Sequence, residues 1–148
     1  MAFAQNVTSG NITGVSADNK AAAVNVKLTG NLTQTANGDF RQLRDLCYQM
    51  AKLDLSTANC TNIPKNALHS RHNLKTLILP NNLVNIGSQA FFACDAMTGT
   101  LSIPRTVKSI GASAFSMCKS LQGITLPSNS QLVNLGSYAF KGCESLTG

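Results

Sequence analysis

IGSQAFFAC, which runs from Ile86 to Cys94, returns 24 residues later as IGASAFSMC, from Ile110 to Cys118. A third copy, LGSYAFKGC, begins 25 residues after the second and runs from Leu135 to Cys143. A phrase that recurs with a period in this range is the sequence signature of a stacked repeat protein. The sequence therefore predicts a solenoid in which each copy belongs to one turn.

A short strand-like segment, in which two apolar residues flank a third residue, precedes the first copy and follows each of the first two copies. These segments are Leu77–Pro80, Leu101–Pro104 and Ile124–Pro127. A second apolar segment then leads into the next copy, which gives a unit of about 23 residues, inside the range of leucine-rich repeats. The same frame extends backwards through residues 63–68 and 43–55. We therefore expect an α/β leucine-rich-repeat solenoid of about five units, with parallel strands on one face and short helices or turns elsewhere.

Stacking is required because no single unit can bury its own apolar face. The frame predicts continuous interior columns of like residues, formed by Phe91, Phe115 and Phe140 and by Ala90, Ala114 and Ala139. Residues 36–148 are assigned to these repeats, with the last unit incomplete. This points to a fragment of a longer array.

The N-terminal part departs from the repeat. Residues 39–52 carry apolar residues at helical spacing and predict a helix, with Asn37 or Asp39 as its cap. Residues 1–35 are assigned to an N-terminal cap with a strand near 23–28, in which Val26 and Leu28 take the column of Leu53 and Leu55.

The cysteines invite a chemical interpretation, but the repeat frame favours a structural one. Cys47, Cys94, Cys118 and Cys143 share one column, and Cys60 takes an apolar position. A buried free cysteine behaves as a small hydrophobic residue. No C-x-x-C pair is present, so zinc binding is weakly supported. We expect reduced, buried thiols.

Catalysis and cofactor binding are not indicated. His69 and His72 are the two histidines, and no carboxylate or further ligand lies near them in sequence except Cys60. No serine lies in a G-x-S-x-G motif, and the acidic residues are dispersed over different units. We expect no enzyme activity, no metal and no cofactor.

Charge and hydropathy exclude further classes. The net charge is +6, but only 12% of residues are charged and the basic ones are scattered, so we expect no nucleic acid as partner. No apolar run reaches membrane-spanning length. The first residues lack the features of a secretory signal peptide.

The unit I-G-x-x-A-F-x-x-C-x-x-L-x-x-[IL]-x-[IL]-P resembles the BspA-like class of leucine-rich repeats. Residues 86–127 match closely, residues 40–80 match with substitutions such as Pro64 for Gly and Arg71 for Cys, and residues 132–148 match until the chain ends. Proteins of this class are mostly secreted or surface-attached bacterial proteins, common among Bacteroides relatives. The resemblance implies an extracellular or cell-surface location, adhesion to host or bacterial surface proteins, and no catalytic residues.

The resemblance also implies that the strand segments align into a parallel sheet whose middle residues point outward. Lys27 is also one of these outward middle residues, and Gly123 is one of the residues that flank them. The candidate partner-binding surface, called the strand face below, consists of Lys52, Asp54, Thr76, Ile78, Thr100, Ser102 and Thr125. Ile78 is notable as an apolar residue among polar neighbours, although any sheet must expose some side chains to solvent.

The leading hypothesis is therefore a non-catalytic recognition or adhesion module that binds proteins or cell surfaces through this face. The alternative is an architectural spacer within a larger surface protein. A glycan-binding role would need exposed aromatic residues, for which only Tyr48, Tyr138 and Phe92 are available.

Overall fold

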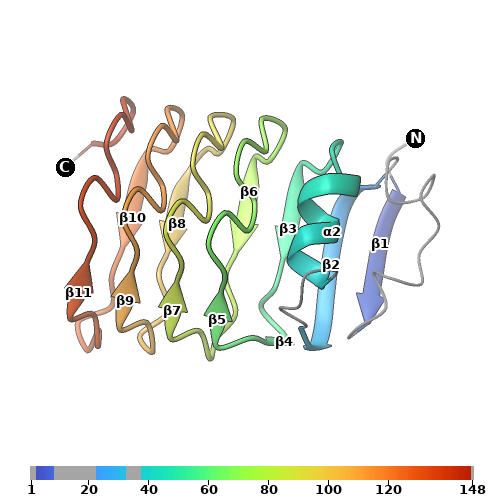
Figure 1. The fold of residues 1–148 in the computed structure, drawn as a ribbon, viewed down its shortest axis with the longest axis horizontal. Coiled ribbons are helices and arrows are strands. Elements are labelled where there is room, and N and C mark those ends of the chain that lie inside the picture. Colours follow the sequence, from blue (N-terminus) through green and yellow to red (C-terminus); the bar gives the residue numbers. More distant parts are fainter. Residues whose placement is uncertain (1–2, 9–22, 33–37, 148) are drawn as a thin grey trace.

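The computed structural model describes residues 3–8, 23–32 and 38–147. The chain winds in successive turns along one axis, from β1 at one end to β11 at the other (Figure 1). This arrangement confirms the predicted solenoid of stacked parallel strands. Of the predicted N-terminal cap, residues 1–2, 9–22 and 33–35 lie outside the described residues, so the cap assignment stays a prediction.

The first side of the solenoid carries the longer strands. They are β1 (Phe3–Thr8), β2 (Ala23–Asn31), β3 (Lys52–Asp54), β6 (Thr76–Ile78), β8 (Thr100–Ser102) and β10 (Gly123–Thr125). All pairing on this side is parallel: β1, β2, β3 and β6 follow one another in one sheet, and β8 pairs with β10 in a second. Val26 lies opposite Leu53 in this register, as the sequence predicted.

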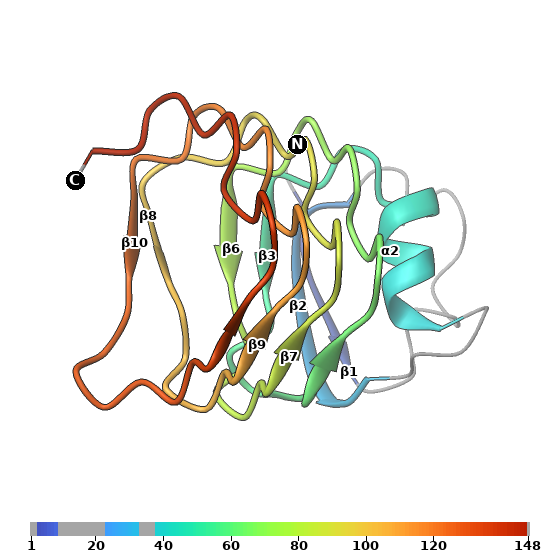
Figure 2. The ribbon, with the colours of Figure 1, turned by 60° about the vertical axis from the view of Figure 1, so that its left-hand side comes forward.

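The second side carries two-residue strands. They are β5 (Asn62–Ile63), β7 (Asn85–Ile86), β9 (Ser109–Ile110) and β11 (Asn134–Leu135), and they form one continuous parallel sheet. The short strand β4 (Ala58–Asn59) pairs with the end of β2. Figure 2 shows β8 and β10 of the first side to the left of β7, β9 and β11 of the second, with the connecting turns above both.

The repeated nonapeptide forms a corner of β-turns. Within one copy, Ala90 N donates to Gly87 O (3.2 Å) and Cys94 N donates to Phe91 O (3.3 Å). Gln89 and Ala93 have φ of 55°, the left-handed conformation required at the third position of a type II turn. This conformation keeps the later units in turns and prevents them from forming the short helix that the first unit contains.

The corner is also bonded from one turn to the next. Gln89 N donates to Ala112 O (3.0 Å), Phe91 N to Ala114 O (2.8 Å) and Ala93 N to Ser116 O (2.9 Å). Backbone amides along the corner therefore alternate: one donates to a carbonyl of its own turn, and the next donates to a carbonyl of the following turn. The corner is a third hydrogen-bonded side of the solenoid, beside the two sheets.

The helix is shorter than predicted. α2 spans Asp39–Leu46, and Cys47 ends it with φ of −100° and ψ of 53°. The chain must then turn to pair with β2, where Ala51 N donates to Val24 O (2.7 Å), and this pairing overrides the helical pattern of residues 47–52. Gly38 takes the N-cap position without a side-chain cap, so the prediction that Asp39 caps the helix is wrong; Asn37 lies outside the described residues.

The core consists of the predicted columns. The rings of Phe91 and Phe115 stack with centroids 5.1 Å apart, and those of Phe115 and Phe140 with centroids 5.4 Å apart. Ala90 and Ala114 are fully buried beside them. Small and large side chains alternate around the ring column, which allows close packing between turns.

Close contact between successive turns explains why the repeated phrase contains a glycine. A Cβ placed on Gly111 would lie 2.5 Å from Ser88 N in the preceding turn, and one on Gly87 would lie 2.5 Å from Lys65 N. Successive turns approach too closely at this position for any side chain. Glycine therefore sets the spacing of the stack here.

We expect Gly111→Ala to lower the free energy of unfolding by about 3 kcal/mol, because backbone must move to make room for the new methyl group. Gly99→Ala is the matched control: its φ is +74°, but a Cβ there meets nothing within 4 Å, so it loses only about 1 kcal/mol through backbone strain. Urea unfolding of both variants measures the difference. Equal losses would contradict the steric explanation.

Candidate functional site

The strand face lies on the outer surface of the first side. In β3 and β6, Lys52 is opposite Thr76 and Asp54 is opposite Ile78. In β8 and β10, Ser102 is opposite Thr125. Two outward rows therefore run along the solenoid, while the residues between them, such as Leu77 and Leu101, point into the core. Of the predicted residues, all except Asp54 are exposed; they are Lys52, Thr76, Ile78, Thr100, Ser102 and Thr125.

Asp54 differs from its neighbours because its carboxylate is already engaged. Its side chain is only 16% exposed and lies 3.7 Å from Lys27 Nζ. Ser56 N also donates to Asp54 Oδ1 at 2.9 Å. Partial burial opposes ionisation of Asp54, but the hydrogen bonds from Ser56 and the charge of Lys27 outweigh it and lower the pKa of the carboxyl group. Asp54 therefore forms a charge-neutral pair with Lys27 on this face.

The strand face is interrupted between β6 and β8. These strands are not paired, although β6 pairs with β3 and β8 pairs with β10. A cavity of about 40 Å³ lies at this boundary, with Thr76 and Thr100 at its rim and Leu77 and Leu101 among its lining. Sequence reasoning missed this feature; its signal was the extra residue near Thr98–Thr100, which we expected a loop to absorb without effect on the sheet.

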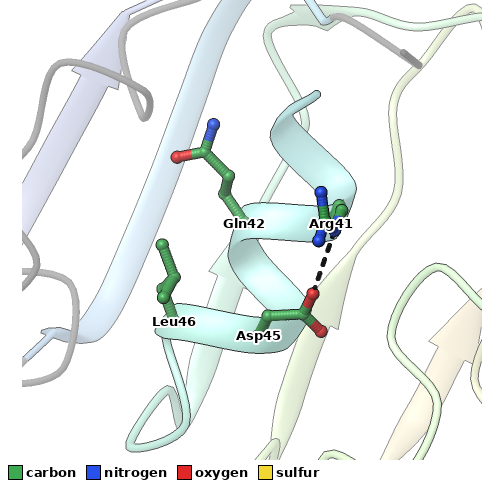
Figure 3. Close-up of a pocket in the computed structure, with 4 residues that line it drawn as sticks. All are labelled: Arg41, Gln42, Asp45 and Leu46. Atoms are coloured by element: carbon green, nitrogen blue, oxygen red, sulfur yellow. Dashed lines mark ion pairs between the residues drawn. The ribbon is translucent and has the colours of Figure 1, made fainter. Parts of the chain in front are cut away.

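A larger cavity lies beside α2, with a volume of about 270 Å³, and the described residues at its wall are Arg41, Gln42, Asp45 and Leu46. Arg41 Nε lies 3.3 Å from Asp45 Oδ2, and the dashed line in Figure 3 marks this ion pair. Arg44 Nε lies 2.7 Å from Asp45 Oδ1, and this hydrogen bond lowers the pKa of Asp45. The charges at this wall are thus paired with one another, and Leu46 contributes an apolar surface.

The two histidines lie on the corner beside the strand face. His72 Nδ1 is 2.9 Å from Asp95 Oδ1 in the next turn. His69 Nδ1 is 2.8 Å from Ser70 Oγ, and its ring stacks on Phe92 with centroids 5.2 Å apart. In the described part of the chain, no three His, Cys, Asp or Glu side chains are grouped as metal ligands would be.

The cysteine column is a hydrogen-bonded part of the core. Cys94 Sγ donates to Leu68 O (3.2 Å), Cys118 Sγ to Phe91 O (3.2 Å) and Cys143 Sγ to Phe115 O (3.1 Å). In each case the acceptor is a backbone carbonyl of the preceding turn. It lies three residues before the residue that takes the cysteine's place in that turn. The column therefore joins successive turns by side-chain hydrogen bonds, beyond the apolar packing that the sequence predicted.

Burial disfavours the reactive form of the Cys94 and Cys60 thiols. It raises the pKa of Cys94 to about 12 and that of Cys60 to about 11. Since the thiolate is the reactive form, we expect the buried thiols to react with a disulfide reagent at pH 8 only when the protein is unfolded. Cys143, which is half-buried, reacts first. Rapid reaction of Cys94 and Cys118 in the native protein would contradict this account; a time course with and without urea measures it.

The same burial makes stability depend on pH. The pKa of Cys94 is raised in the folded state from an ordinary value of 9.0 to about 12. The thiol therefore stays protonated to a higher pH in the folded state than in the unfolded chain. The free energy of unfolding therefore falls as pH rises through this interval. Urea unfolding of wild type and Cys94→Val between pH 8 and pH 11 tests it, and an equal slope in both proteins would contradict it.

Among the described residues, no helix has the length and apolar character needed to cross a membrane. No curated protein matches the sequence significantly. The solved structures that share the fold include two leucine-rich repeat proteins. A leucine-rich repeat protein from Bacteroides ovatus ATCC 8483 has 19% identity and a TM-score of 0.62, with 96% of this chain and 36% of that chain covered. The leucine-rich repeat protein of T. pallidum has 20% identity and a TM-score of 0.56, with 96% of this chain and 71% of that chain covered.

The chain thus spans about a third of the length of the Bacteroides ovatus protein that it resembles, 36%. The family description "BspA type Leucine rich repeat region (6 copies)" matches residues 18–100 and 97–148. This match covers the described turns and reaches back to β2, within the predicted cap. The resemblance inferred from the repeated phrase is therefore confirmed, and the chain belongs to the BspA-type leucine-rich repeat family.

Proposed function

We propose that this chain is a non-catalytic recognition or adhesion module that binds other proteins through its strand face, as part of a secreted or surface-attached bacterial protein. The observation that carries the proposal is the pair of outward rows on β3, β6, β8 and β10. They place hydroxyl groups and one exposed isoleucine on two neighbouring patches, one on β3 and β6 and one on β8 and β10. Extended surfaces of this kind are what solenoid proteins use for binding.

The composition of the face suits protein recognition better than binding of a small charged ligand. Thr76, Thr100, Ser102 and Thr125 supply uncharged donors and acceptors, and Ile78, 37% exposed, supplies apolar area at the centre. The one carboxylate, Asp54, is paired with Lys27. A partner can therefore cover the face without leaving a buried carboxylate unpaired.

The alternative role is that of a spacer. It is supported by the continuous pairing of β5, β7, β9 and β11 and by the bonded corner, which together make a stiff stack. A spacer requires only this stack and no particular residues on the strand face, so the two roles differ in their response to surface substitutions.

The test is the triple variant Thr76→Glu, Ile78→Glu and Ser102→Glu. The matched control places glutamates at exposed positions on or beside the second sheet: Thr61→Glu, Asn85→Glu and Asn134→Glu. Binding is measured against immobilised extracellular matrix proteins and against bacterial cells. If the strand face binds, the first variant loses at least about tenfold in affinity, since central interface residues carry most of the binding energy, and the control keeps its affinity.

Equal losses in the two variants would contradict the assignment of the face. Absence of binding by the wild-type chain to every protein and cell type would favour the spacer role. Circular dichroism and urea unfolding establish that both variants remain folded.

A further inference from the structure

The boundary between β6 and β8, called the seam below, begins at one extra residue. Met97 is followed four residues later by the inward Leu101, whereas in the preceding turn Leu77 follows Leu74 after three. The inserted segment contains Gly99, whose φ of +74° lies in the left-handed region. A left-handed glycine beside an added residue is typical of one class of β-bulge, which disrupts the ladder of backbone bonds next to it.

The backbone of β6 offers unused hydrogen-bonding groups to the seam. Toward β3, Thr76 N donates to Ala51 O (3.0 Å). On the same edge, Ile78 O accepts a hydrogen bond from Leu55 N (2.9 Å). Neighbouring residues of a strand direct their N–H and C=O groups to opposite edges. The N–H and C=O of Leu77 therefore point toward the seam.

The facing groups of β8 follow by the same rule. Ile103 N donates to Thr125 O on the β10 side (3.0 Å), so the C=O of Thr100 and the N–H of Ser102 are directed toward β6. β6 and β8 are not paired with each other. In this part of the described chain, the seam thus holds backbone donors and acceptors without ladder partners. Leu77 is buried, and a buried backbone group without a partner is costly.

The width of the seam determines what fits between the strands. Figure 2 shows β8 and β10 set apart from β6. Paired strands lie about 4.8 Å apart, and a third strand between two others needs about twice that spacing. Cα atoms of β6 and β8 approach within 8 Å of one another, which excludes an inserted strand. A water molecule between an amide and a carbonyl makes two hydrogen bonds and widens a strand pair by roughly 2 Å, to roughly 7 Å. This spacing lies within the observed limit.

The cavity in the seam has both the room and the polar partners for such water. Its volume of about 40 Å³ accommodates about two or three water molecules, since one requires roughly 10–15 Å³. Thr76, Thr98 and Thr100 line it together with the apolar Leu77 and Leu101. Threonine hydroxyl groups both donate and accept hydrogen bonds. With the backbone groups of the two strands, they can supply the two to four partners that hold a water molecule in place.

We propose that the seam is a binding site for ordered water, in which one or two water molecules link Leu77 of β6 to Thr100 and Ser102 of β8 and take the place of the missing ladder bonds. The first side is then continuous through water at this one step, while β7 and β9 on the second side remain paired directly. The site is independent of the recognition role proposed above, because it requires no partner protein.

The first test is a crystal structure of the chain at a resolution that shows ordered water. We expect a water oxygen at about 2.7–3.2 Å from both Leu77 N and Thr100 O. Deletion of Gly99 restores the shorter spacing and should replace this water by a direct bond between the two strands. Deletion of Asn129 is the matched control, because it shortens a loop whose neighbouring strands are paired, and it should leave the water in place.

The second test asks whether the water is held in solution. Water–amide NOE and ROE spectra should give Leu77 N–H a cross-peak with the sign of long-lived water in wild type and in the Asn129 deletion. The Gly99 deletion should lose this cross-peak. Thr76→Val and Thr100→Val remove hydroxyl protons whose exchange with solvent would otherwise imitate the signal, and the cross-peak should survive both because the backbone groups remain.

A direct bond between Leu77 N and Thr100 O in the wild-type crystal would overturn the proposal, as would a seam without water in a structure that shows other ordered water. A water signal at Leu77 with the sign found for surface amides would also overturn it, since that result means ordinary hydration. Should deletion of Gly99 prevent folding, the wild-type crystal structure and the spectra of the two valine variants decide the question.

Discussion

Hydrogen bonding between the backbones of successive turns is the constraint on which this molecule depends. A turn of about 23 residues has neither its own apolar partner nor its own strand partner. Three bonded sides meet both needs: the strands of the first side, the short strands of the second, and the corner in which Phe91 N reaches Ala114 O. Gly87 and Gly111 allow the turns to approach closely enough for these bonds to form.

This constraint explains why the two length variations have different consequences. The extra residues at 128–131 lie in the loop between the sheets, and β10 and β11 still pair with their neighbours. The extra residue at Thr98–Gly99 lies where β8 begins and separates that strand from β6. Inward positions such as Leu101 keep their place in the core in both cases. Apolar packing tolerates the insertion, whereas the ladder of backbone bonds does not.

The repeat frame was sufficient to predict the columns of the core, because identical side chains at a fixed period must stack. It placed Val26 opposite Leu53, aligned the phenylalanines and assigned Thr76 and Ser102 to the surface. It could not predict the end of α2 or the left-handed residues Gln89 and Ala93, because bonds to other turns determine both. The engagement of Asp54 by Lys27 was missed for the same reason: the two residues are distant in sequence and adjacent in register.

The bonded corner offers the most direct test of this account. The amides of Gln89 and Phe91 donate to the following turn, while the equivalent amides of Tyr138 and Phe140, in the last turn, have no acceptor among the described residues. Hydrogen exchange measured by NMR should therefore show Phe91 N–H at least about a hundredfold slower than Phe140 N–H, since exchange at Phe91 requires the stack to open. Equal exchange rates at the two positions would show that bonds between turns do not hold the solenoid together.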